Sequence, residues 1–222
     1  MNKLNVDKVY ICHYKKLKDR KDELKNHLED NKIFDYEFVE LFDKDEWDKE
    51  EIRKQYPNVF EVTDENRYLN DSEVSLTLKH SWIIQDAHSK EYESSLVLED
   101  DVLLCYDFLD NFNNYKSQLP DDWDIAWVGS CYNLHADYDG KTNVYKTNHG
   151  SRCTHAFAIS KQFCQKVVNE VKNVNDASDF FYNKLVKNFN LNNYWFEPCL
   201  AFQDIKYQSA ISGRYWPSHL MQ

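Results

Sequence analysis

The sequence predicts an α/β domain with a mostly parallel central sheet, and two features of its 222 residues carry that prediction. Short runs of β-branched and aromatic residues alternate with longer charged segments, in which apolar residues recur at helical spacing. Strands that alternate with helices in this way are typical of a parallel sheet covered by helices. The length suits one domain, and we expect residues 1–222 to form it.

The predicted strands are short and apolar. KVYICH is rich in β-branched and aromatic residues, YEFVEL alternates between apolar and polar residues, and SLVL is apolar enough for a fully buried strand. DIAWV, CTHAFAI and YWF complete the series. We expect strands at 8–13, 36–41, 95–98, 124–128, 153–159 and 194–196.

The predicted helices separate these strands. The first is amphipathic, with Leu24 and Leu28 on one face, and the second ends before Pro57. A helix-cap signal precedes the third, and the stretch between the second and third has the character of a loop. We expect helices at 19–30, 43–56, 72–89, 106–118, 160–172 and 179–187, with an irregular segment at the C-terminal end.

Composition excludes several classes of function. The 27 Lys and Arg residues are outnumbered by 38 Asp and Glu, and a formal charge of −11 disfavours binding to nucleic acid or an anionic membrane. No apolar stretch is long enough for a signal peptide or a membrane span, so we expect a cytoplasmic protein. The six cysteines lack metal-binding spacing and are expected to be reduced. Glycine motifs that cradle phosphates are absent, so an anionic substrate would need a cation or a local basic cluster.

The segment SSLVLEDDVLL places three adjacent carboxylates, those of Glu99, Asp100 and Asp101, directly after a predicted buried strand. Adjacent carboxylates repel one another, and burying one without a partner is costly. Ligands bind at the carboxyl ends of strands in α/β sheets, and two carboxylates at i and i+2 can share a hard cation such as Mg²⁺ or Mn²⁺. The sequence therefore predicts a metal site at Glu99 and Asp101, with capping of a neighbouring helix as the structural alternative.

Other candidate residues have weaker signals. The acids at 137–139 and 121–124 lie in segments typical of solvated loops and turns. Asp179 stands near a predicted helix start, where capping is the default role and general-base catalysis the functional one. His80 and His155 are, each taken alone, typical of hydrogen-bonded structural histidines.

Several segments together resemble glycosyltransferase family 25, which includes bacterial lipooligosaccharide galactosyltransferases and collagen galactosyltransferases. The resemblance rests on VYICHYKKLKDR, SLTLKHSWII, LVLEDDVLL, WDIAWVGS, THAFAISK and ASDFFYNKLVKNFNLNNYWFEPCLAFQ. The chain departs from the family pattern at Cys12-His13, which replaces Asn-Leu, and at Lys79-His80, where many members have Ser-His. Ala177-Ser178-Asp179 stands for Pro-Ile-Asp.

The resemblance implies a GT-A type fold, a UDP-sugar donor and a Mn²⁺ (or Mg²⁺) cofactor. Asp101 would contact the metal, Glu99 would lie near the metal or the ribose, and Asp100 would orient the donor. Asp179 would be the general base of an inverting transfer.

The resemblance also implies contacts of the donor with residues outside the acidic segment. Ile11, His13 and Arg20 would line the nucleotide pocket, and His80 would reach it from its helix. Trp127 and Gly129 would shape the sugar site.

The expected partners are therefore a UDP-hexose, galactose or glucose, and a hydroxyl of a glycan or protein acceptor, in polysaccharide or glycoprotein biosynthesis. Two alternatives remain open. A metal-dependent phosphatase of the haloacid dehalogenase type also has an apolar strand before its acids, although its first acid is a nucleophilic Asp early in the chain. A carbohydrate- or nucleotide-sugar-binding protein without turnover would also suit the aromatic content.

Overall fold

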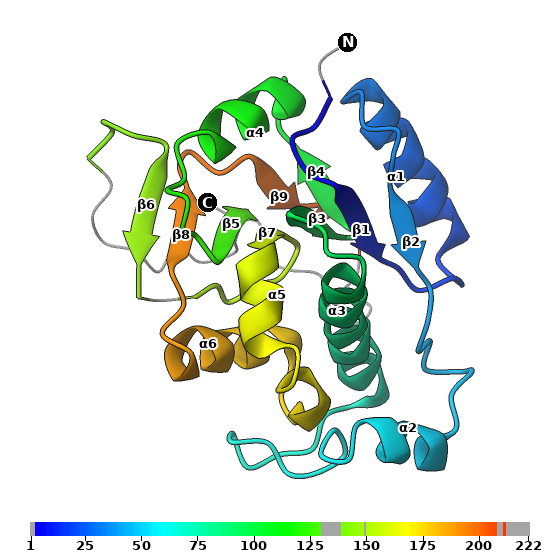
Figure 1. Ribbon diagram of the computed structural model, residues 1–222. Coiled ribbons are helices and arrows are strands. Elements are labelled where there is room, and N and C mark those ends of the chain that lie inside the picture. The colour runs from blue at the N-terminus through cyan, green and yellow to red at the C-terminus, as the bar shows by residue number, and fades with distance from the viewer. Residues whose placement is uncertain (1–2, 130–138, 149, 208–210, 212–222) are drawn as a thin grey trace.

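The computed structural model describes residues 3–129, 139–148, 150–207 and 211, and its centre is a seven-stranded sheet (Figure 1). The strands of this sheet are β1 (Lys8–Cys12), β2 (Glu37–Val39), β3 (Ser94–Glu99), β5 (Ile125–Gly129), β6 (Val144–Thr147), β7 (Ala156–Ser160) and β8 (Asn193–Phe196). Their spatial order is β2-β1-β3-β7-β5-β8-β6. β7 and β6 run antiparallel to their neighbours, whereas the other strands share one direction. The prediction of an α/β fold with a mostly parallel sheet is confirmed.

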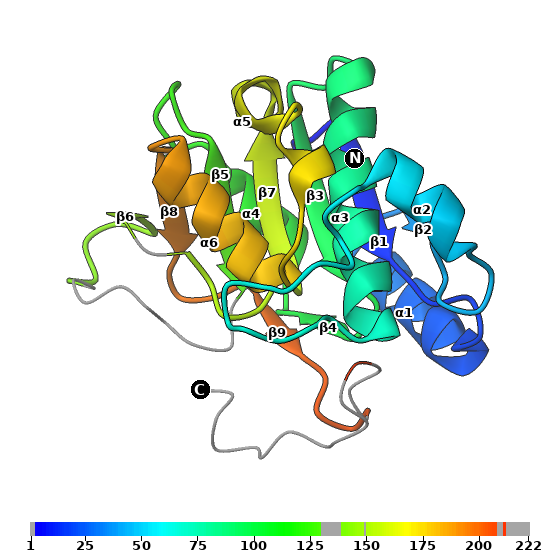
Figure 2. The same ribbon diagram turned by 90° about the horizontal axis from the view of Figure 1, so that it is seen from below.

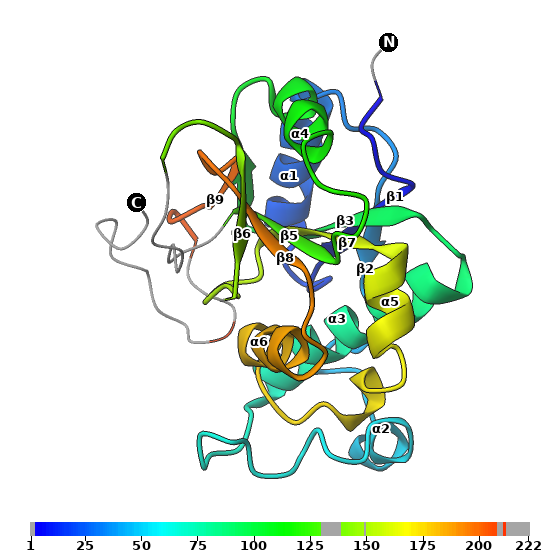
Figure 3. The same cartoon turned by 60° about the vertical axis from the view of Figure 1, so that its left-hand side comes forward.

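Helices cover both faces of the sheet. They are α1 (Lys18–Asp30), α2 (Lys49–Gln55), α3 (Asp71–Ser89), α4 (Phe108–Lys116), α5 (Lys161–Val167), the short 3₁₀ helix η1 (Val171–Asn173) and α6 (Ser178–Asn188). α1 and α4 lie on one face, and α3, α5 and α6 lie on the other (Figure 3).

The alternation of side chains along each strand separates two hydrophobic clusters. Val9 and Ile11 of β1 point into the cluster under α1 and α4, while Tyr10 and Cys12 point into the cluster under α3, α5 and α6. Both sets are almost fully buried. Because both faces of the strand are covered, its sequence is apolar at every position from Val9 to Cys12.

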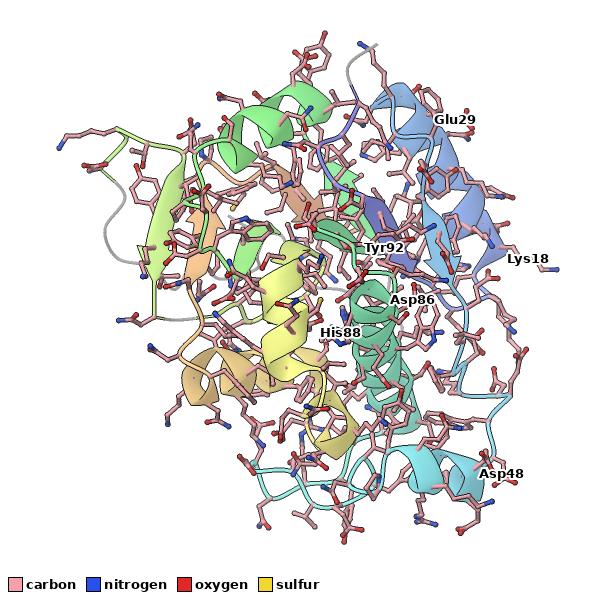
Figure 4. All side chains as sticks on the ribbon, viewed as in Figure 1. Lys18, Glu29, Asp48, Asp86, His88 and Tyr92 are labelled. Atoms are coloured by element: carbon pink, nitrogen blue, oxygen red, sulfur yellow. The ribbon has the colours of Figure 1, made fainter. Side chains whose placement is uncertain are left out.

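α3 is fixed at both ends. At its start, the Asn70 side chain accepts from the backbone N–H of Glu73, and the Glu73 carboxylate accepts from the Asn70 N–H, which completes a capping box. Near its end, the Tyr10 hydroxyl donates to Asp86 Oδ2 at 2.6 Å. Figure 4 shows Asp86 at this end of the helix, on the same side as Tyr92.

A second sheet of two strands joins the C-terminal part of the chain to the acidic segment. β4 (Val102–Leu104) pairs antiparallel with β9 (Ala201–Gln203). The pairing places the residues after β9 beside the turn that carries Asp100 and Asp101, since the Asp204 N–H donates to the Asp101 carbonyl at 2.6 Å. Figure 2 shows β4 and β9 at the sheet edge near the first turns of α3 and α6.

Several predicted boundaries are wrong, for identifiable reasons. The predicted helix 43–56 begins only at Lys49, where Asp48 caps it, because the Asp43 side chain instead holds Lys79 and the Lys15 N–H. The strand predicted at 153–159 begins at Ala156. The helix predicted at 160–172 ends at Val167, and the 3₁₀ helix follows. The expected irregular C-terminal segment contains β9.

Two other expectations from composition meet the structure. Every helix in the described part of the chain is too short or too polar to cross a bilayer. Cys12, Cys105, Cys164 and Cys199 form no disulfide bond, as expected, but Cys153 is disulfide-bonded. The expectation of six reduced cysteines is therefore wrong, because spacing along the chain does not show which loops meet in space.

Candidate active site

Polar side chains gather where β1 and β3 end. The two strands are parallel neighbours, and Cys12 at the end of β1 lies opposite Glu99 at the end of β3. His13 follows β1, and Asp100 and Asp101 follow β3. The sheet therefore brings His13 beside carboxylates that come some ninety residues later in the sequence.

A cleft of about 90 Å³ opens between this acidic turn and the start of α3. Predicted site residues that line it are His13, Arg20, Glu99, Asp100 and Asp101. A larger groove of about 1110 Å³ lies between the end of α1 and the start of α4, and its walls are mostly apolar. Glu99, Asp100 and Asp101 do not line it. Because the chemistry-bearing side chains converge on the smaller cleft, we take that cleft as the candidate active site.

Asp100 is held on the α1 side of the cleft by two basic side chains. Its Oδ1 accepts from the Arg20 guanidinium at 2.7 Å, and its Oδ2 accepts from His13 Nδ1 at 2.7 Å. All three side chains are nearly buried. The protein itself thus supplies a basic partner for each oxygen of Asp100, which offsets the cost of burying a carboxylate.

Asp101 has a different environment. Its Oδ2 accepts from the Gln203 amide at 2.9 Å and lies 4.0 Å from Arg20, whereas its buried Oδ1 has no hydrogen-bond partner among the described residues. Burial, with the nearby negative charges of Glu99 and Asp100, raises the pKa of Asp101 to about 7. A buried carboxylate oxygen without a donor is costly, and a bound cation would supply what is missing.

Glu99 turns toward β7 and α6. Its Oε1 accepts from the Thr154 hydroxyl at 2.5 Å, and the Thr154 oxygen lies 2.9 Å from the Ser178 hydroxyl. His80 Nε2 approaches the same Glu99 oxygen at 3.8 Å. Glu99 is therefore linked through hydroxyl groups to the first residue of α6.

Asp179 lies in the first turn of α6. Its Oδ1 accepts from the Phe180 N–H at 2.9 Å, and its Oδ2 lies 3.9 Å from Arg152 Nε. Asp179 is not the N-cap of α6, because Ala177 holds that position and makes no side-chain capping bond, so the capping role considered for Asp179 is wrong. Burial raises the pKa of Asp179 to about 6, although the Phe180 N–H and Arg152 act in the opposite direction. A carboxyl group with a pKa in this range can accept a proton near neutral pH.

The other residues predicted to contact the donor are packed inside the protein. Ile11 is fully buried against the α1 layer, and Trp127 is fully buried against the other layer, where its indole N–H donates to Asn193 at 2.7 Å. A Cβ on Gly129 would come within 2.1 Å of the Ala201 carbonyl, so this glycine allows β5 and β9 to approach. His80 is wholly buried behind Glu99, stacked on Phe157.

Sequence reasoning missed several residues around the cleft. Lys79 lines it, and its buried ammonium group donates to Asp43 Oδ1 at 2.6 Å and to a backbone carbonyl. Gln203 lines it as well, and the Tyr207 ring lies 4.5 Å from the Arg20 guanidinium carbon. Lys79 could have been noticed as a lysine within an otherwise apolar helix stretch, but nothing local distinguishes Gln203 or Tyr207.

Protein side chains alone do not supply a complete set of ligands for the predicted metal site. Within the described residues, no three His, Cys, Asp or Glu side chains are grouped closely enough to hold a metal ion. Glu99 and Asp101 still fit a hard cation, because their donors are oxygens and Asp101 Oδ1 is buried without a partner. Mg²⁺ commonly binds in this way, with one or two carboxylates and the rest of its shell from water and substrate phosphates.

The competing acidic segments do not form such a cluster in the described residues. Asp124 is buried, but its carboxylate accepts from Lys166 and from the Asn192 N–H. Asp139 is exposed and bonds locally to Lys141 and Tyr145, and residues 137 and 138 lie outside the described part. These acids act as turn or packing residues.

The comparison with protein families agrees with the geometry. The family model described as glycosyltransferase family 25 (LPS biosynthesis protein) matches residues 6–182, most of the chain. The chain belongs to glycosyltransferase family 25. The matched region contains the acidic turn and the start of α6, and family membership supports a role in glycosyl transfer, with a sugar donor and an acceptor. No curated protein matches the chain.

Solved structures share a distant likeness. A glycosyltransferase involved in the glycosylation of the major capsid of PBCV-1 has 15% identity, covers 86% of this chain and 81% of its own, and gives a TM-score of 0.45. A197 from STIV has 10% identity, coverage of 88% and 83%, and a TM-score of 0.43. Mouse xyloside xylosyltransferase 1 has 9% identity, coverage of 83% and 71%, and a TM-score of 0.39.

Proposed function

We propose that this member of family 25 transfers a hexose, galactose or glucose, from a UDP-sugar to a hydroxyl of a glycan or protein acceptor, with Mn²⁺ or Mg²⁺ as cofactor. The observation that carries the proposal is the buried, unpartnered Oδ1 of Asp101 beside Glu99. An acidic cleft cannot hold a diphosphate by itself, because the two repel, so a cation must lie between them.

The residues take distinct roles in this proposal. Glu99 and Asp101 hold the cation, which when bound neutralises the charge that develops on the departing diphosphate. Asp100 keeps Arg20 and His13 in place at the wall of the donor pocket, through the two 2.7 Å contacts. His80 supports Glu99 from behind.

Asp179 acts as the general base. It takes the proton of the acceptor hydroxyl while the acceptor oxygen bonds to the anomeric carbon, and the bond from that carbon to the diphosphate breaks with its electron pair on the leaving group. Attack opposite the leaving group inverts the anomeric centre. The pKa of Asp179, about 6, suits this role, because the group is ionised at neutral pH and still basic enough to accept a proton.

UDP release from a panel of UDP-hexoses tests the proposal, because slow hydrolysis of the donor does not require a known acceptor. We expect Mn²⁺-dependent release from one donor, with loss in EDTA and in Asp101→Ala. Asp121→Ala, which removes an exposed carboxylate from a loop remote from the cleft, is the matched control and should retain full activity.

Two other results would contradict the proposal. Binding of a UDP-sugar without any release would favour a binding protein. Phosphate release from aryl phosphates, with no UDP-sugar turnover, would favour a phosphatase.

A further inference from the structure

The segment 150–154, just before β7, is fastened to the first turns of α6. The Asn183 side chain donates to the Ser151 carbonyl at 2.9 Å, and the Arg152 guanidinium carbon lies 4.6 Å from the centre of the Phe180 ring. A third contact joins the hydroxyls of Thr154 and Ser178 at 2.9 Å. The segment and the helix start are therefore expected to move as one unit.

The start of α6 has no side-chain cap of its own. Its N-cap residue is Ala177, which makes no capping hydrogen bond, whereas α3 begins with a capping box and α5 begins with Ser160 accepting from the Phe163 N–H. A helix start without a capping side chain loses about 1 kcal/mol of stabilisation and frays more readily. The position of this first turn therefore depends on contacts from outside the helix.

The hydrogen bond from Thr154 to Glu99 determines which hydroxyl is the donor in the contact between Thr154 and Ser178. A hydroxyl has one proton, and Thr154 donates it to Glu99 Oε1 at 2.5 Å. The Ser178 hydroxyl must then donate to the Thr154 oxygen. Thr154 is 4% exposed and Ser178 is 6% exposed, so water does not readily replace either bond.

We propose that Thr154 and Ser178 are positioning residues, which fix the first turn of α6, and Asp179 with it, relative to Glu99. The proposal rests on the proposed function, in which Glu99 belongs to the metal site and Asp179 is the base. Transfer needs both groups at set distances from one anomeric carbon, and the hydroxyl pair links Glu99 to the first residue of α6 through two hydrogen bonds. Ser178 adjoins Asp179 in the chain, so a shift of one carries the other.

Removing the Thr154 hydroxyl tests the proposal. Thr154→Val keeps the shape of the side chain but breaks both hydrogen bonds, and misplacement of a catalytic group by about 1 Å costs on the order of 100-fold in rate. We expect kcat for UDP release from the active donor to fall about 10- to 100-fold, with KM for the donor changed less. Thr154→Ser, which restores the hydroxyl, should return kcat to within a few-fold of the original.

A double-variant comparison separates positioning from general damage. In an Asp179→Asn background the base is absent, so Thr154→Val should lower the remaining kcat only slightly. Equal fold losses in both backgrounds would show that Thr154 acts independently of Asp179 and would overturn the proposal.

Two further outcomes keep the test decisive. Should Thr154→Val fail to fold, Ser178→Ala keeps the Thr154–Glu99 bond, and an unchanged kcat in that variant would overturn the proposal. If the original protein releases UDP and Thr154→Val does so equally well, the positioning role fails while the proposed function stands. If the original protein binds Mn²⁺ but turns over no UDP-sugar, the proposed function is what fails.

Discussion

The carboxylates on the two sides of the acidic turn have different hydrogen-bond partners. On the α1 side, Asp100 accepts one hydrogen bond from Arg20 and one from His13, both at 2.7 Å. On the β7 and β9 side, Glu99 and Asp101 accept from a hydroxyl and an amide, and the closest basic groups lie at 3.8 and 4.0 Å. Three neighbouring residues of similar chemistry thus have unlike electrostatic surroundings.

We interpret this difference as one between a structural carboxylate and the carboxylates of the proposed site. A buried charge that the protein balances with its own cations contributes to the fold, because each partner would be unsatisfied without the other. A buried carboxylate left without a counter-charge destabilises the fold and persists where function requires it. By this criterion Asp100 belongs to the framework. Asp101 and Asp179 are only partly balanced, since their basic neighbours Arg20 and Arg152 lie at 4.0 and 3.9 Å, and this agrees with the metal-binding and general-base roles that we propose for them.

The largest expected effect on stability comes from the balanced side. Asp100→Ala leaves the Arg20 guanidinium buried without its carboxylate and removes the partner of His13, and breaking such a buried pair costs about 3–5 kcal/mol. Urea unfolding followed by fluorescence should show this loss in the free energy of unfolding. Asp121→Ala, at an exposed position, should stay within about 0.5 kcal/mol of the original. A loss below 1 kcal/mol in Asp100→Ala would contradict the comparison.

Substitution of Asp179 should change the free energy of unfolding in the opposite direction to substitution of Asp100. Its pKa is about 6 in the folded protein against the ordinary value of 3.8, so the folded state holds a proton that the unfolded state has lost between these pH values. The contribution of Asp179 to stability therefore falls as the pH rises from about 4 to about 6, by up to about 3 kcal/mol, and stays at the lower value above that range. Asp179→Asn should remove this part of the pH dependence, leave the part that the raised pKa of Asp101 causes, and be the more stable protein at pH 7.5.

Activity should change in the reverse direction over the same range. A general base must be ionised, so kcat/KM for UDP release should rise with an apparent pKa near 6 as the pH increases. Asp179→Asn should lower kcat by about 100- to 10,000-fold. An acid limb far below pH 6, or full activity in the variant, would assign the base to another residue.

The effect of Mn²⁺ on stability should differ between the original protein and an Asp101 variant. In EDTA, Asp101→Asn removes an unbalanced buried charge and should raise the free energy of unfolding by about 1–2 kcal/mol. Mn²⁺ at 100 times its dissociation constant should stabilise the original protein by about 2.7 kcal/mol but leave the variant unchanged. Thermal unfolding with and without Mn²⁺ measures both effects, and an equal response of the two proteins would place the metal elsewhere.

The sequence predicted those elements of the fold that have a local pattern of their own. β1, β3 and β5 were predicted because each is a continuous apolar run, and α3 because it is long and opens with a capping signal. β4, β6 and β9 have three or four residues each and were not predicted, although β2 and β8 are equally short and were predicted from YEFVEL and YWF. β4, β6 and β9 form because neighbouring backbone is present to pair with, which no local sequence shows.

The acidic residues of the candidate site were predicted from the sequence, but their partners were not. Glu99, Asp100 and Asp101 were predicted because three acids after an apolar strand are unusual, and their spacing suggested that Glu99 and Asp101 face one cation. Their hydrogen-bond partners were not predicted, because Thr154 and Gln203 lie 55 and 102 positions away from the carboxylates that they contact. Contacts of that range are products of the topology, so periodicity and spacing along the chain do not reveal them.

The smallest predicted effect concerns the aromatic ring beside Arg20. The Tyr207 ring lies 4.5 Å from the guanidinium carbon, and a partly exposed contact of this kind contributes about 0.5–1 kcal/mol. Tyr207→Leu should lower the free energy of unfolding by that amount, whereas Tyr207→Phe keeps the ring and removes only the hydroxyl that donates to Glu23. Urea unfolding of both variants beside Asp100→Ala compares the ring with the carboxylate as partners of Arg20. If Tyr207→Leu lowers the free energy of unfolding as much as Asp100→Ala does, Arg20 is held mainly by the segment that follows β9. The surroundings of Asp100 would then depend on β9 as much as those of Asp101 do.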